Sequence, residues 1–267
     1  MQLLEVDMED KKYTQNDIDE RWNSEWAVSK DVPVSTILRD RLFKEAYKVY
    51  LQYIPKEKFS LLEIGAWRGR YGLALARDYP VSKVTITDSQ DTSVNDIRRL
   101  SQELKLNNVT IESAEACALQ YEDNAFDVVF ADGVIQHIIE YDTAMDEMIR
   151  VLKPGGKLIV SAVNTNNPPH SLYKWILKKK GIEYDYGYER TYTPKQMHEL
   201  FYEHGLVNID DDGFYFAYGM YRWGYKIKIF KLLSKILNRF IKVLDSVTNR
   251  FFSRKYGFEI FSVGTKK

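Results

Sequence analysis

The sequence predicts an α/β fold with a mostly parallel sheet of seven strands and helices on both faces. A helical lead-in precedes the sheet, and a helical insertion precedes the last strand. The main observation is that short apolar runs alternate with segments whose apolar residues recur at helical spacing. A second is that strong turn formers, such as Pro154-Gly155-Gly156, separate these segments. A third is the composition, 45% hydrophobic and 28% charged, which is that of a globular protein with a sizeable core.

Individual elements can be placed from these patterns. Continuous apolar runs are typical of strands in a parallel sheet that is covered on both faces. Strands are expected at 60–65, 84–88, 109–111, 126–131, 157–162 and 258–263. Helices are expected at 35–54, 71–77, about 93–105, from Ala144 to the Pro154 turn, and after Thr193, where Pro194, Gln196 and the closing Gly205 are typical of a capped helix.

The order of these elements divides the chain into three parts. They are a helical cap over 1–57, a core over 58–210, and a carboxyl-terminal part over 211–267 that holds the insertion and the final strand. Cys117 is the single cysteine, the amino terminus is acidic where a signal peptide would be basic, and no apolar run is long enough to cross a bilayer. We therefore expect a cytoplasmic protein.

Charge is unevenly distributed although the formal net charge is zero. Residues 221–267 contain twelve lysines and arginines but only two acids. A helix within this segment is expected to be amphipathic, and it would lie on an anionic membrane, close over the site as a lid, or form a subunit contact such as a homodimer. A lid or subunit contact is favoured. The apolar stripe is Phe230, Leu233, Leu237, Phe240, Leu244 and Val247, and the basic side chains are Lys228, Lys231, Lys235, Arg239 and Lys242.

Residues 184–225 are rich in aromatic side chains, which favours either the wall of a pocket for an amphipathic, aromatic or sugar-like substrate or ordinary packing of an added layer. These aromatics are Tyr184, Tyr186, Tyr188, Tyr192, Tyr202, Phe214, Tyr215, Phe216, Tyr218, Tyr221, Trp223 and Tyr225.

Acidic side chains lie at the ends of three successive strands, at the edge where an open parallel sheet binds ligands. The segment from Glu63 to Gly69 spans the end of the first strand, and Gly65 and Gly69 allow a tight turn and a close approach to a ligand. Asp88 ends the second strand and is placed to accept hydrogen bonds from both hydroxyls of a ribose. Glu115 follows the third strand and is placed to bond an adenine amino group. The pattern predicts a nucleoside-containing ligand.

These motifs resemble those of the class I S-adenosylmethionine-dependent methyltransferases with a Rossmann-like fold. Leu61 to Arg70 is similar to the family's first motif, an acid followed by spaced glycines, and 121–127 is similar to its loop into strand four. Val151 to Leu158 resembles the segment before strand five. The resemblance covers about 58–165 and resumes at 191–210.

The resemblance implies S-adenosylmethionine as cofactor and no metal. One departure is Trp67, which stands where the family has its middle glycine, so the ring packs under the sheet edge, shapes the pocket, or blocks the cofactor. The cofactor-binding residues that the resemblance implies are Glu63, Gly65, Ala66, Trp67, Gly69, Asp88, Ser89, Glu115, Ala116 and Asp132.

The candidate catalytic residues are Asp132 and His137, just beyond strand four. His137 would serve as general base because histidine as a residue type titrates near neutral pH, with the alternative that it caps a helix or bonds backbone. His170, in the loop expected at 167–170, has a small role at most in lining the pocket. His198 and His204 are interpreted as structural, and Arg68 and Arg70 as solvated side chains or as guides for an anionic substrate.

We expect a methyltransferase that acts on a small molecule, a lipid or a glycan precursor, more at oxygen than at nitrogen or carbon. The alternative is a catalytically inactive binding or scaffold protein of the same fold. Aminopropyl transfer ranks lower because no acidic polyamine pocket is visible. A nucleic-acid substrate is not expected because the basic residues gather on one helix.

Overall fold

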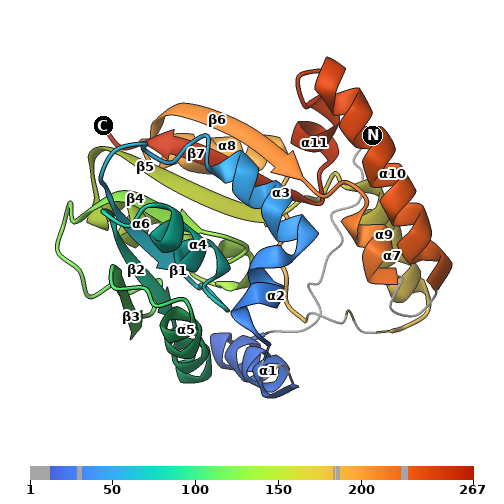
Figure 1. The fold of residues 1–267 in the computed structure, drawn as a ribbon. Coiled ribbons are helices and arrows are strands. Elements are labelled where there is room, and N and C mark those ends of the chain that lie inside the picture. Colours follow the sequence, from blue (N-terminus) through green and yellow to red (C-terminus); the bar gives the residue numbers. More distant parts are fainter. Residues whose placement is uncertain (1–12, 29–31, 183, 185–186, 224–227) are drawn as a thin grey trace.

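The computed structural model describes residues 13–28, 32–182, 184, 187–223 and 228–267. Its sheet has the strand order β3-β2-β1-β4-β5-β7-β6 (Figure 1), in which β1 to β5 are parallel and β7 is antiparallel to both β5 and β6. The predicted mostly parallel seven-stranded sheet is confirmed. The strands are β1 Ser60–Ile64, β2 Lys83–Asp88, β3 Val109–Ser113, β4 Phe126–Ala131, β5 Leu152–Val163, β6 Val207–Phe214 and β7 Glu259–Thr265.

Helices cover both faces of the sheet because successive strand residues point to opposite sides. On one face, Leu61, Val128 and Ile159 pack with α3, α4 and α5, and on the other, Leu62, Val129 and Leu158 pack with α6 and α8. The helices are α1 Gln15–Val28, α2 Val34–Arg39, α3 Arg41–Tyr50, α4 Arg70–Asp78, α5 Asp91–Glu103, α6 Tyr141–Val151, α7 Pro168–Lys179, α8 Pro194–Glu203, α9 Tyr218–Trp223, α10 Lys228–Val247 and α11 Phe251–Tyr256.

The strand order places the site. From β1 the chain moves outward through β2 to β3 and then returns to the other side of β1 as β4, so the switch point of the sheet, where open parallel sheets bind ligands, lies at the ends of β1 and β4. Ile64 pairs with Ala131 across these two strands. The next residues, Gly65 and Asp132, therefore leave the sheet side by side.

The lead-in helix predicted at 35–54 is two helices, and the prediction of one was wrong. Asp40 has an extended backbone, with φ −54° and ψ 135°, and its Oδ1 accepts a hydrogen bond of 2.8 Å from the amide of Phe43. Aspartate is a favoured amino-terminal cap because its carboxylate satisfies a free helix amide. Asp40 thus starts α3 where the apolar periodicity alone shows no break.

The expectation of a loop at 167–170 was also wrong, because these residues begin α7. The Asn167 side chain accepts a hydrogen bond of 2.9 Å from the amide of His170. Pro168 and Pro169 occupy first-turn positions. Proline lacks an amide hydrogen, and this costs no hydrogen bond there because first-turn amides have no acceptor within the helix. By contrast, the capping box predicted at Thr193 and Gln196 is confirmed.

Two further differences concern strands. No strand was placed at 207–214, where three consecutive acids at 210–212 hide the pattern, yet β6 pairs along this stretch with β7. The Pro154-Gly155-Gly156 turn does not end a helix, since α6 stops at Val151 and the turn lies inside β5, where the register with β4 is irregular. The helical insertion is confirmed as α9 to α11, between β6 and β7.

Several sequence-based expectations fall on positions that the structure does not describe. Tyr186, Tyr225 and the acidic segment 1–12 lie outside the described residues, as do the side chains of Tyr221, Trp223, Lys228 and Lys231. Among the helices that are described, none is long and apolar enough to cross a membrane.

Candidate active site

The turn after β1 has a left-handed backbone at three positions. Gly65 has φ +60°, Trp67 has φ +51° and Gly69 has φ +61°. A Cβ atom on Gly65 would lie 2.6 Å from a methyl group of Val134, so packing as well as conformation requires glycine there. A non-glycine residue in this conformation, here Trp67, costs about 1 kcal/mol of conformational free energy.

The backbone of Trp67 is anchored while its ring is exposed. Its amide donates a 2.8 Å hydrogen bond to Asp88 Oδ2, and its carbonyl accepts one of 2.5 Å from the Ser93 hydroxyl. The side chain is 41% exposed, with the Arg68 guanidinium 5.4 Å from the ring centre. Of the alternatives for this residue, packing beneath the sheet edge is therefore wrong.

Asp88 is a buried carboxylate held by two backbone amides. Besides the Trp67 amide, that of Gln90 donates to its Oδ1 at 3.0 Å. Burial raises the pKa of Asp88, and these amides oppose the rise. Each oxygen keeps a further lone pair, which suits the acceptance of hydrogen bonds from ligand hydroxyls. Ser89, the next residue, is half-buried.

Glu115 and Ala116 follow β3 on the same side of the sheet. The amide of Ala114 donates to the Asp88 carbonyl at 3.2 Å, which brings the two loops together. Burial and then the charges of Asp19 and Asp88 raise the pKa of Glu115. Carboxylates at these positions can accept hydrogen bonds from the hydroxyl and amino groups of a nucleoside, such as the adenosine part of S-adenosylmethionine.

Glu63 is placed inside the fold. It is 2% exposed, and its Oε2 accepts a 2.8 Å hydrogen bond from the amide of Gly72 in the first turn of α4. Burial raises its pKa to about 8, against the opposing effect of that amide. A Cβ on Gly72 would lie 2.4 Å from Oε2. Glu63 therefore holds the start of α4 against the end of β1.

Asp132 is the centre of a polar cluster at the switch point between β1 and β4. Its Oδ1 accepts hydrogen bonds from the Tyr50 hydroxyl at 2.7 Å and from the Ser161 hydroxyl at 3.0 Å, and its Oδ2 lies 3.3 Å from Arg70 Nη2. The interpretation of Arg70 as merely solvated was thus wrong. Burial raises the pKa of Tyr50 and of nearby Tyr215 well above the usual value, so both phenols stay neutral.

Glu259 completes this cluster. The Ser161 hydroxyl oxygen accepts the amide of Gly133 at 2.8 Å and lies 2.6 Å from Glu259 Oε1, in addition to its contact with Asp132. One hydroxyl proton serves only one carboxyl group, so the second contact requires a protonated carboxyl that donates to Ser161. Burial, followed by the charge of Asp132, raises the pKa of Glu259 well above its usual value. The pair therefore shares one proton, and the raised pKa of Glu259 favours Glu259 as its carrier.

Sequence reasoning missed Tyr50, Ser161 and Glu259. A signal for Glu259 was present, because an acid at the start of an otherwise apolar strand is expensive to bury without a partner.

Both ring nitrogens of His137 are engaged. Its Nδ1 lies 2.9 Å from the carbonyl oxygen of Tyr188, which can only accept, so Nδ1 carries a proton. Its Nε2 lies 3.1 Å from the side-chain amide of Gln136. These contacts favour the backbone-bonding alternative over the role of general base. His198 contacts Asp211 at 2.6 Å, and His204 contacts the Leu200 carbonyl at 2.8 Å.

Helix α1 covers this end of the sheet. The Gln15 side chain donates to the carbonyl of His137 at 3.3 Å and accepts from the amide of Ile139 at 3.1 Å. The Trp22 ring meets the His137 ring edge-on, with centres 4.9 Å apart. Since Asp19 also acts on Glu115, α1 bridges the loops after β3 and β4.

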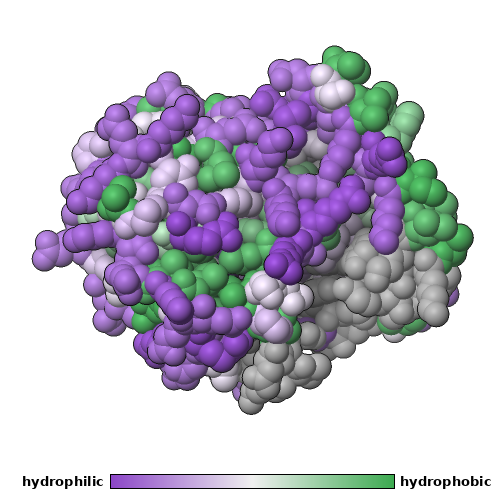
Figure 2. Space-filling view, viewed as in Figure 1, coloured by the Kyte–Doolittle hydropathy of each residue, from purple (hydrophilic) through white to green (hydrophobic). Residues whose placement is uncertain are grey.

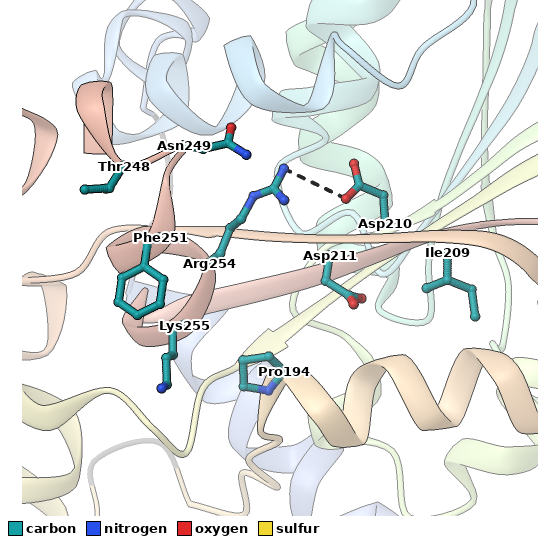
Figure 3. Close-up of a pocket in the computed structure, with 9 residues that line it drawn as sticks. All are labelled: Pro194, Ile209, Asp210, Asp211, Thr248, Asn249, Phe251, Arg254 and Lys255. Atoms are coloured by element: carbon teal, nitrogen blue, oxygen red, sulfur yellow. Dashed lines mark ion pairs between the residues drawn. The ribbon is translucent and has the colours of Figure 1, made fainter. Parts of the chain in front are cut away.

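An open hollow of about 480 Å³ lies elsewhere, among α8, β6 and α11 (Figure 3). Arg254 and Asp210 face each other across it, with Nη2 and Oδ1 3.9 Å apart. Its lining includes none of the predicted cofactor-binding residues.

The aromatic residues of 184–225 differ in exposure. Tyr184, Tyr192 and Phe214 are buried, whereas Tyr202 is exposed.

Comparisons with known proteins agree with this geometry. Residues 55–205 match a family model described as a methyltransferase domain. Demethylmenaquinone methyltransferase of Oceanobacillus iheyensis is 29% identical over 108 residues, which is 40% of this chain and 44% of that protein, so the match spans less than half of this relative. The Staphylococcus aureus protein of the same name is 24% identical over 208 residues, 69% of this chain and 85% of that protein.

Solved structures share the fold. A Thermotoga maritima protein described as a "SAM-dependent methyltransferase, possible histamine N-methyltransferase" has a TM-score of 0.61 at 16% identity, and the match covers 94% of this chain and 99% of that chain. A Haemonchus contortus phosphoethanolamine N-methyltransferase in complex with S-adenosylhomocysteine has a TM-score of 0.59 at 19% identity, with coverages of 96% and 59%. With more than half of its length inside the family model, the chain belongs to the methyltransferase-domain family and is a class I S-adenosylmethionine-dependent methyltransferase.

Proposed function

We propose that the chain is a cytoplasmic enzyme that methylates an oxygen atom of a small molecule, lipid or glycan precursor. The observation that carries the proposal is the pair of Asp132 and Glu259 joined through Ser161 beside Gly65, at the switch point of the sheet. The names of the demethylmenaquinone methyltransferase relatives support an acceptor of the small-molecule class.

The cofactor would be held by the residues at the ends of β1, β2 and β3. Asp88 would accept hydrogen bonds from the ribose hydroxyls, and Glu115 from the adenine amino group. The turn through Gly65, Ala66, Trp67 and Gly69 would lie along the methionine part. Glu63 would act indirectly, by holding the start of α4 in place. Ser89 and Ala116 follow Asp88 and Glu115 in the chain and would flank their carboxylates.

A hydroxyl acceptor must lose its proton when its oxygen is methylated, and Asp132 is the proposed base. The cofactor supplies an electrophilic methyl carbon. Arg70 and the Tyr50 hydroxyl hold the Asp132 carboxylate in place, while protonated Glu259, acting through Ser161, stabilises its charge. Glu259 and Ser161 are positioning residues, and His137 is the less favoured base because its Nδ1 proton is committed to a backbone carbonyl.

Two measurements test the proposal. Calorimetry with S-adenosylhomocysteine should show binding, and its absence at millimolar ligand would favour the inactive scaffold, in which Trp67 blocks the cofactor. Methyl transfer should then be measured with reduced demethylmenaquinone as the first acceptor, and mass spectrometry should locate the new methyl group. A methyl group on oxygen is expected, and a methyl group on the ring carbon would overturn the oxygen assignment. Asp132→Asn should bind S-adenosylhomocysteine but lose about 100-fold or more in rate. Asp142→Asn, at a 65% exposed side chain, is the matched control.

A further inference from the structure

Helix α10 presents a continuous row of large apolar side chains to solvent. Ile236 is 60% exposed, Phe240 57% and Val247 79%. The spacing of three or four residues places the whole row on one side of the helix. The apolar face, as we call it, consists of Ile229, Leu232, Leu233, Ile236, Phe240, Val243 and Val247.

The opposite side of α10 already has its partners. Ile241 and Asp245 are buried against the protein, and Asp245 accepts hydrogen bonds from the amides of Phe252 and Ser253. The stripe read from the sequence is therefore divided: Leu237 and Leu244 lie half-buried between the two sides, whereas Phe240 faces solvent. Internal packing accounts for one side of the helix but not for the apolar face.

Basic side chains line one flank of the apolar face. Lys235 and Arg239 are exposed, and together with Ile236 and Arg41 of α3 they line a shallow groove of about 320 Å³. Lys242 lies on the same flank and pairs with Glu45. The one acid in α10, Asp245, is buried. Figure 2 shows hydrophobic side chains along the outer edge of the molecule at α10, with hydrophilic side chains beside them.

This combination selects one kind of occupant. An exposed apolar row flanked by lysine and arginine suits the boundary between anionic headgroups and acyl chains. A second copy of the chain would instead bring two basic flanks together, with no exposed acid on α10 to offset them. A lid role is not favoured, since α10 packs on α9 and α11 at one end of the molecule (Figure 1).

We propose that α10 is a membrane-docking helix, which inserts its apolar face into an anionic lipid surface while Arg41, Lys235 and Arg239 contact the headgroups. The proposal concerns attachment only and is independent of the proposed methyl transfer.

Vesicle flotation of the full chain tests it. Vesicles of phosphatidylcholine with about one-third phosphatidylglycerol should carry the protein, and pure phosphatidylcholine vesicles should carry much less. Ile236→Ser/Phe240→Ser should lose binding to both. Lys235→Gln/Arg239→Gln should weaken binding to the anionic vesicles about 30-fold, since each basic residue near such a surface contributes about fivefold.

Matched controls distinguish docking through α10 from non-specific binding to vesicles and from misfolding. Val81→Ser removes a 68% exposed apolar side chain elsewhere, and Lys195→Gln removes an exposed charge on α8, so both should bind as the wild type does. Circular dichroism and S-adenosylhomocysteine binding should be unchanged in every variant. Equal binding to neutral and anionic vesicles, or undiminished binding by the Ile236/Phe240 variant, overturns the proposal. So does a dimer in sedimentation that this variant abolishes.

Discussion

Replacing Glu63 by glutamine should change how the stability of the protein depends on pH. Glutamine keeps an oxygen that can accept the Gly72 amide but cannot ionise. In the wild type, burial raises the pKa of Glu63 from 4.5 to about 8. As pH rises from 4.5 to 8, the unfolded chain releases this proton while the folded protein retains it. The free energy of unfolding therefore falls across this window and becomes level above it.

The size of the effect follows from the pKa difference. Each pKa unit corresponds to about 1.4 kcal/mol, so the contribution of Glu63 to the free energy of unfolding falls by about 5 kcal/mol in total, of which about 3 kcal/mol is reached at pH 7. In Glu63→Gln this fall in the free energy of unfolding does not occur, because glutamine does not ionise. Relative to the wild type, its stability should therefore rise by several kcal/mol between pH 5 and pH 9.

Urea unfolding followed by circular dichroism at pH 5, 7 and 9 measures this directly. Glu57→Gln is the matched control, because Glu57 is exposed and its replacement should leave the pH dependence unchanged. If the curves for Glu63→Gln and the wild type stay parallel from pH 5 to pH 9, Glu63 is ionised in the fold and the reasoning fails.

Three further substitutions test other parts of the site. Asp88→Asn should weaken S-adenosylhomocysteine binding by about 1.5–3 kcal/mol because a charged acceptor is lost, and an unchanged calorimetric affinity would refute its assignment. Gly72→Ala should destabilise the fold by about 1–3 kcal/mol, because the added methyl group meets the Glu63 carboxylate; an unchanged urea midpoint would contradict that packing. Glu259→Gln should keep methyl transfer near the wild-type rate, since glutamine can donate to Ser161 as the protonated acid does, whereas Glu259→Leu should lower the rate without weakening S-adenosylhomocysteine binding. A Gln variant as slow as the Leu variant would mean that Glu259 acts in its charged form.

Some parts of the fold were predictable because their determinants are local. The apolar runs of β1 and β4 identify buried strands, and Thr193, Pro194 and Gln196 identify a helix start, through neighbours only a few residues away. Strand β6 was not predictable, because it contains consecutive acids and forms a strand only by pairing with β7.

The sequence by itself determined six of the seven strands, the family and the acids at the ends of β1 and β2, because these depend on periodicity and on motifs of a few residues. Only the tertiary structure decided that Glu63 is buried beneath α4 and that the Trp67 ring faces solvent. It also decided that Ser161 meets Glu259, 98 residues further along the chain. The reason is physical: burial, proton sharing and the outward face of α10 depend on which distant elements pack together, and no local pattern in the chain encodes those contacts.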